Sequence, residues 1–82
     1  REFVLSEIAT IFRNEFGQPD LIVHYGSSPK TIEKWDSVNN LVIISAIEER
    51  FKIEFSIDSI FKSENVGDLC DYVVSNTLIF DK

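Results

Sequence analysis

The fold is decided by residues 37–51, which read Ser37-Val38-Asn39-Asn40-Leu41-Val42-Ile43-Ile44-Ser45-Ala46-Ile47-Glu48-Glu49-Arg50-Phe51. On a helical wheel that advances about 100° per residue, the apolar side chains divide into two groups on opposite sides. The larger group is typical of a buried stripe and consists of Ile43, Ile44, Ile47 and Phe51. The stretch therefore predicts an amphipathic helix over 37–51, with Asp36 or Ser37 as its N-cap.

The opposite side of this helix begins apolar and ends acidic. Val38 and Val42 lie one turn apart, with Leu41 beside them. A purely solvated face is polar throughout, whereas neighbouring apolar side chains form a patch that favours contact with a partner. We therefore expect a docking surface made of Val38, Leu41, Val42, Ser45, Glu48 and Glu49.

On the N-terminal side, residues 2–16 carry apolar side chains three and four positions apart, which predicts a first helix. Gly17 provides a C-terminal cap, and Pro19 prevents the helix from resuming. Residues 17–36 hold most of the helix breakers, so they form a connection of about twenty residues; loops of this length in small domains tend to be functional. We expect Ile32 and Trp35 to pin this loop to the core.

On the C-terminal side, a short third helix is expected to follow Ser56, which is a plausible cap. A fourth begins at Asn65, with Asp68 three residues later as a variant capping box. Its predicted buried stripe comprises Val66, Leu69, Cys70, Val73 and Val74. We expect the terminal Leu78-Ile79-Phe80 to pack on the bundle. The prediction is an all-α, single-domain, four-helix bundle over 1–82, with three longer helices and one short one.

Composition favours a binding or carrying role over catalysis, because 82 residues leave little room to enclose a substrate. The formal charge of −6 and the lack of a Lys/Arg cluster argue against nucleic-acid and membrane partners. Cationic protein partners fit better. The single Cys70 excludes an internal disulfide. No apolar run approaches the roughly 20 residues of a membrane span, so we expect a cytoplasmic monomer.

Ser37 stands where the long loop delivers the chain to the second helix. A phosphodiester on its hydroxyl would lie near unpaired backbone N–H groups and the positive end of the helix dipole. Asp36 can cap the helix, and its carboxylate could also help hold a divalent cation during phosphoryl transfer. Without further information, Asp-Ser before a helix indicates only an N-cap.

Two stretches add that information. Residues 35–53, from Trp35-Asp36-Ser37 to Phe51-Lys52-Ile53, resemble the acyl carrier protein signature of Asp-Ser-Leu, an apolar helix and an acidic pair before Phe. Residues 65–73 are similar to that family's last helix, with its Val-Gly-Asp-Leu start. The resemblance implies an acyl-carrier-like bundle with 4′-phosphopantetheine covalently attached to Ser37, beside Asp36.

The resemblance also implies how the protein works and with whom. A phosphopantetheinyl transferase moves the arm from coenzyme A to the serine, with Mg²⁺ in the transferase site. The arm's thiol then holds acyl groups as thioesters and presents them to acyl-transferring or acyl-activating enzymes with basic or apolar docking patches. The carrier is then not an enzyme and needs no catalytic residue and no metal site of its own.

The chain departs from the family pattern at several positions. Val38 replaces the usual Leu, and Asn39, Asn40, Val42 and Arg50 stand where acidic or small polar residues are common. The second helix is less acidic than in carriers of primary fatty-acid synthesis, which favours a specialised bacterial pathway.

Three alternatives remain open. A peptidyl or aminoacyl carrier tends to read Gly-Gly-x-Ser, whereas this chain has Lys34-Trp35-Asp36-Ser37. A helical adaptor could have kept the fold without the arm. A hydrolase with Ser37 and His24 is the weakest reading, because no residue pattern orients that pair.

Overall fold

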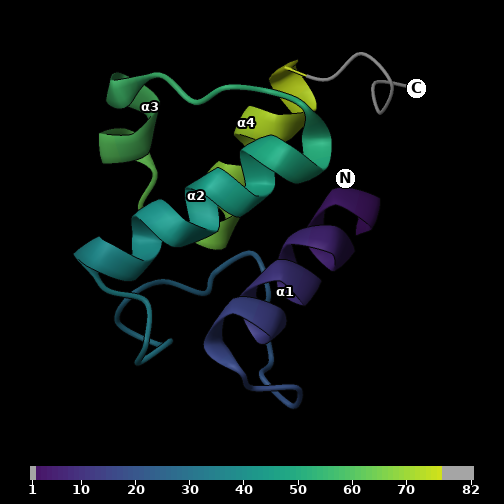
Figure 1. The fold of residues 1–82 in the computed structure, drawn as a ribbon, viewed down its shortest axis with the longest axis vertical. Coiled ribbons are helices and arrows are strands. Elements are labelled where there is room, and N and C mark those ends of the chain that lie inside the picture. Colours follow the sequence, from purple (N-terminus) through teal and green to yellow (C-terminus); the bar gives the residue numbers. More distant parts are fainter. Residues whose placement is uncertain (1, 77–82) are drawn as a thin grey trace.

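The computed structural model describes residues 2–76, and they form four helices without a strand. These are α1 (Glu2–Phe16), α2 (Ser37–Phe51), α3 (Ile57–Lys62) and α4 (Val66–Asn76), with the long loop between α1 and α2 (Figure 1). The predicted all-α bundle of three longer helices and one short one is confirmed. Leu78-Ile79-Phe80 lies outside the described residues. None of the four helices has the length and apolar character needed to cross a membrane.

The predicted helix ends are present as backbone and side-chain hydrogen bonds. Gly17 takes a positive φ of 63°, and the N–H groups of Gly17 and Gln18 bond the carbonyls of Asn14 and Arg13, which is a Schellman cap. Ser56 caps α3 by accepting from the Ser59 N–H.

The cap of α4 confirms the predicted variant capping box. Asn65 Oδ1 accepts from the Asp68 N–H at 2.8 Å. In return, Asp68 Oδ2 accepts from the N–H of Glu64, one residue earlier than in the standard box, also at 2.8 Å.

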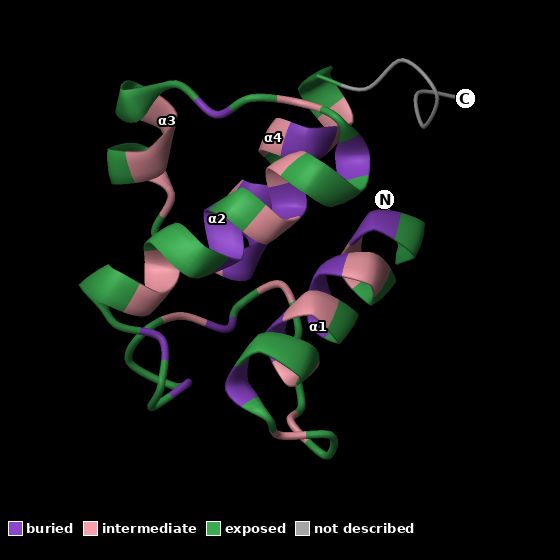
Figure 2. Cartoon of the chain, viewed as in Figure 1, coloured by how far each residue is buried: buried purple, intermediate pink, exposed green. Residues whose placement is uncertain are grey.

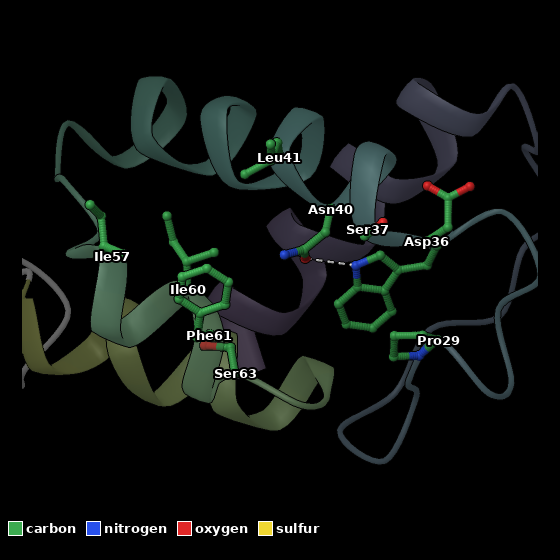
Figure 3. A pocket seen from close by; sticks show the side chains of 10 residues that line it. Pro29, Asp36, Ser37, Asn40, Leu41, Ile57, Ile60, Phe61 and Ser63 are labelled. Carbon is green, nitrogen blue, oxygen red and sulfur yellow. Dashed lines mark hydrogen bonds between the residues drawn. The ribbon is translucent and has the colours of Figure 1, made fainter.

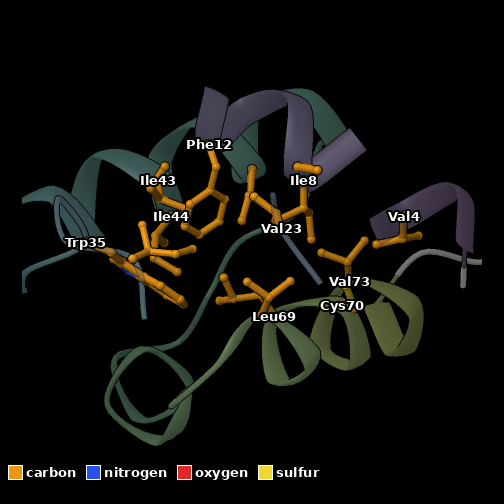
Figure 4. Close-up of a cluster of buried hydrophobic side chains, with 14 of the residues drawn as sticks. Val4, Ile8, Phe12, Val23, Trp35, Ile43, Ile44, Leu69, Cys70 and Val73 are labelled. Atoms are coloured by element: carbon orange, nitrogen blue, oxygen red, sulfur yellow. The ribbon is translucent and has the colours of Figure 1, made fainter. Parts of the chain in front are cut away.

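The core lies where α1 packs against both α2 and α4 (Figures 2 and 4). It holds the apolar stripes predicted for α1, α2 and α4, and Cys70 is fully buried as expected. Val74, the last residue of the predicted α4 stripe, is only partly buried. The buried hydrophobic residues of the helices are Val4, Ile8, Ala9, Phe12, Phe16, Ile43, Ile44, Ile47, Phe51, Val66, Leu69, Cys70 and Val73.

The long loop is attached to the bundle at its beginning, middle and end. Near its start, Arg13 Nε of α1 donates to the Leu21 carbonyl at 2.8 Å. In the middle, two loop carbonyls accept the first N–H groups of α4, Ser27 from Val66 and Tyr25 from Gly67, both at 2.8 Å. These bonds satisfy donors that every helix leaves unpaired at its N-terminus.

At the end of the loop, Ile32 and Trp35 are each only 2% exposed, which confirms that they pin the loop to the core. The Trp35 indole packs edge-on against the Phe12 ring, with centroids 4.8 Å apart. Lys34 Nζ also donates to the last carbonyl of α1, on Phe16. The chain therefore reaches Ser37 along an anchored path.

Candidate functional site

Ser37 is the first residue of α2, and its side chain is exposed. The Asp36 side chain caps the helix: its Oδ1 accepts from the N–H of Val38 at 3.1 Å and from the N–H of Asn39 at 2.8 Å. The predicted capping role of Asp36 is therefore present in the structure. Because both bonds end on Oδ1, neither involves the second carboxylate oxygen.

The same geometry changes one expectation about the serine. A phosphodiester on Ser37 was expected to face unpaired N–H groups, but Asp36 already bonds two of the first N–H groups of α2. The N–H of Asn40 bonds the Asp36 carbonyl at 2.8 Å. An anion next to Ser37 is therefore stabilised mainly by the helix dipole, which favours negative charge within the first turn of α2.

A cavity of about 530 Å³ opens beside Ser37, between the start of α2, the short helix α3 and the end of the long loop (Figure 3). Its walls are mostly apolar, with Leu41 from α2 facing α3. The remaining polar members come from the serine region and the end of α3. The complete lining is Pro29, Trp35, Asp36, Ser37, Asn40, Leu41, Ile57, Ile60, Phe61 and Ser63.

Helix α3 is the part of the site that sequence reasoning missed. It has no buried residue, and Ile57 and Phe61 are 74% and 82% exposed although both border the cavity. Their spacing of four, with Ile60 between them, is typical of a buried stripe. No sequence signal distinguishes a stripe that covers a core from one that borders a cavity.

The residues predicted as a docking surface lie together along α2, and most of them are accessible. Val38, Leu41 and Val42 are 71%, 55% and 42% exposed, and Ser45 and Glu49 are exposed as well. Glu48 is only partly exposed, because its Oε2 accepts from the Phe55 N–H at 2.8 Å and so holds the connection after α2.

The connection between α2 and α3 carries further contacts that keep the cavity wall in place. The buried Phe55 stacks on Tyr72 of α4, with ring centroids 4.3 Å apart. The Tyr72 hydroxyl in turn donates to the Glu54 carbonyl at 2.9 Å. Because α3 has no buried side chain, these contacts at its start do much to fix its position.

His24 does not accompany Ser37. It is exposed in the long loop and does not line the cavity beside the serine. In residues 2–76, no three His, Cys, Asp or Glu side chains gather as metal ligands would.

Comparison with known proteins places this site in context. A family model described as the phosphopantetheine attachment site matches residues 35–73, from Trp35 to the second half of α4. Among solved structures, the chain is similar to the solution NMR structure of a holo acyl carrier protein from Geobacter metallireducens. The two are 32% identical with a TM-score of 0.82, over 88% of this chain and 83% of that one. Comparison with curated protein sequences gave no match.

Proposed function

Because the chain belongs to the acyl carrier protein family, we propose that it carries acyl groups on a covalent 4′-phosphopantetheine attached to Ser37. The observation that carries this proposal is the position of Ser37. It is exposed at the first residue of α2 and lies at the edge of an apolar cavity. It also lies within the stretch matched by the phosphopantetheine-attachment model.

The residues around Ser37 fit such a group. The hydroxyl is accessible to a transferase, and the Asp36 cap fixes the turn that presents it. The helix dipole favours the negative charge that a phosphodiester brings to this end of α2. When attached, the group supplies a terminal thiol that holds an acyl chain as a thioester. The apolar walls of the neighbouring cavity suit the hydrocarbon part of such a cargo, because contact there removes it from water.

The proposed docking surface is the exposed side of α2, made of Val38, Leu41, Val42, Ser45 and Glu49, with the exposed residues of α3 as its neighbours. Glu48 contributes less than its charge suggests, since its carboxylate already bonds the Phe55 N–H. The first partner is a phosphopantetheinyl transferase. Later partners are acyl-transferring or acyl-activating enzymes whose patches are apolar beside the start of α2 and basic beside Glu49.

A specialised bacterial pathway is the finer part of the proposal. Its support is that Asn39, Asn40 and Val42 stand where acidic or small polar residues are common in the family, and that Val42 of α2 is exposed, as are Ile57 and Phe61 of α3. A partner evolved to bind a strongly acidic face finds few carboxylates there. We further propose that 1–82 acts as one carrier domain without catalysis of its own. A cytoplasmic location and a monomeric state stay predictions from the sequence.

The proposal is tested by incubating the protein with coenzyme A, Mg²⁺ and a broad-range transferase, followed by intact mass measurement. The wild type is expected to gain one phosphopantetheinyl group and Ser37→Ala none. Ser6→Ala, which removes an exposed hydroxyl from α1 and leaves the proposed docking surface intact, is the matched control and should be modified like the wild type. Modification of Ser37→Ala contradicts the assignment, because another residue then takes the arm. A wild type that stays unmodified with several transferases contradicts it as well and favours an unmodified adaptor.

A further inference from the structure

We propose that Asn39 and Asn40 are positioning residues, which tie the end of the long loop to the first turn of α2 and so fix the place of Ser37. The inference rests on the proposed function, because it takes Ser37 as the group that accepts phosphopantetheine. It goes beyond that function by assigning a role to two asparagines that carry neither the arm nor the cargo.

Asn39 reaches backwards across Ser37. Its side-chain Nδ2 donates to the Lys34 carbonyl at 2.7 Å, and the N–H of Asp36 bonds the same carbonyl at 3.1 Å. Its backbone N–H bonds Asp36 Oδ1 at 2.8 Å. Asn39 is therefore joined to the loop by both its backbone and its side chain. A carboxylate in this place has no N–H to donate to a carbonyl.

Asn40 makes the second tie. Its Oδ1 accepts from Trp35 Nε1 at 2.8 Å, the bond drawn from Asn40 in Figure 3. The indole is almost fully buried, with its ring against Phe12. A buried indole N–H without an acceptor is costly, so the amide fixes the orientation of a large ring. Trp35, Asn40 and Ser37 all line the same cavity.

The two ties run in the direction opposite to the cap. Asp36 reaches from the loop forward to the helix, whereas Asn39 and Asn40 reach from the helix back to residues 34 and 35. Ser37 lies between the two sets of bonds. These bonds therefore restrain the backbone on both sides of the serine.

This placement bears on the transfer reaction. The Ser37 oxygen forms a bond to the phosphorus of coenzyme A that carries the pantetheine arm. The pyrophosphate bond of coenzyme A breaks, and the nucleotide part leaves. The hydroxyl proton of the serine passes to a base of the transferase or to water. Displacement of a reacting atom by about 1 Å can cost about a hundredfold in rate. Loosening the ties around Ser37 should therefore slow transfer even in a folded protein.

The test compares Asn40→Leu, which keeps the branched shape of the side chain but lacks the acceptor, with Asn40→Asp, which keeps an acceptor oxygen. Transfer is measured as initial rates over a range of carrier concentrations, so that kcat and KM are separated. Trp35 is the single tryptophan of the chain, so its indole N–H gives one assignable NMR signal. We expect Asn40→Leu to move that signal and to lower kcat about tenfold. Asn40→Asp should leave the signal in place and keep kcat near that of the wild type.

Asn39→Leu provides an independent arm, because this side chain is partly exposed and its loss does not open the core. It should also lower kcat, whereas the same change at the exposed Asn14 of α1 should not. Variants that are folded at the assay temperature yet transfer at the wild-type kcat overturn the positioning role, even if the indole signal moves. A wild type that takes no phosphopantetheinyl group refutes the proposed function instead.

Discussion

Ile47→Ala tests whether α2 is oriented as the structure has it. Ile47 is completely buried in the centre of the helix, among the apolar residues of the core. Truncation to Ala removes buried carbon atoms and leaves a cavity, which typically costs about 2–5 kcal/mol. A domain of this size is stable by about 5–15 kcal/mol, so one such change removes a large share of the total. A loss of 3 kcal/mol corresponds to a fall in Tm of about 12–24 °C, at about 4–8 °C per kcal/mol.

Val42→Ala is the matched control. Val42 lies on the same helix, only five positions before Ile47, but on the side that faces away from the core. Val42 is 42% exposed, so removing its two methyl groups forfeits about 1 kcal/mol of burial, well below the cost at Ile47. Alanine is also the better helix former, by about 0.5 kcal/mol. The second effect offsets part of the first, so the Tm of this variant should lie within a few degrees of the wild type.

Thermal unfolding followed by circular dichroism at matched concentration measures both variants. We expect a large fall in Tm for Ile47→Ala and an almost unchanged Tm for Val42→Ala. Equal losses of Tm would mean that α2 is rotated about its axis relative to the structure, and the proposed docking surface would then lie in the core.

Two further predictions concern the partner face and the cap of α4. The protein that carries phosphopantetheine should accept malonyl groups from a fatty-acid-synthase transferase about tenfold more slowly than a fatty-acid carrier does. Val42→Glu should reduce this difference in rate. Equal rates for the wild type and the fatty-acid carrier would remove the support for a specialised pathway. Gly67→Ala should lower Tm, although Ala favours a helix by about 1 kcal/mol relative to Gly. The reason is that the added Cβ would lie 3.1 Å from both the Tyr25 carbonyl oxygen and Asn65 Oδ1. A variant that melts at a higher temperature than the wild type would refute this prediction.

The helices could be predicted from the sequence because each has local signals at its ends. Gly17 after the first helix, Asp36 before the second and Ser56 before the third all act as the caps that their residue types indicate. The buried stripe of α2 also follows from spacing alone, since a helix places residues three and four positions apart on one side.

The site could be predicted only in part, because its other half depends on contacts between distant segments. Leu41 and Phe61 are 20 positions apart in the sequence, and only the packing of α3 beside α2 makes them walls of one cavity. The role of Glu48 was hidden in the same way. Its position on the wheel suggests a free carboxylate, whereas the structure gives it a backbone N–H seven residues later.

Four positions depart from the acidic family pattern, and the structure shows what the side chains do at most of them. These positions are Asn39, Asn40, Val42 and Arg50. Arg50 bonds Glu7 of α1 through Nη2 at 2.6 Å and Nε at 2.7 Å, so a residue that could have faced a partner instead ties α2 to α1. Asn39 and Asn40 tie the same helix to the loop. Side chains at three of these four positions therefore bond other parts of the fold, whereas Val42 is an exposed apolar residue of the proposed docking surface. We therefore expect partner choice to depend on apolar contacts with Val42 and with the exposed residues of α3. The net charge of −6 then acts mainly at long range, by raising the rate of association with cationic partners.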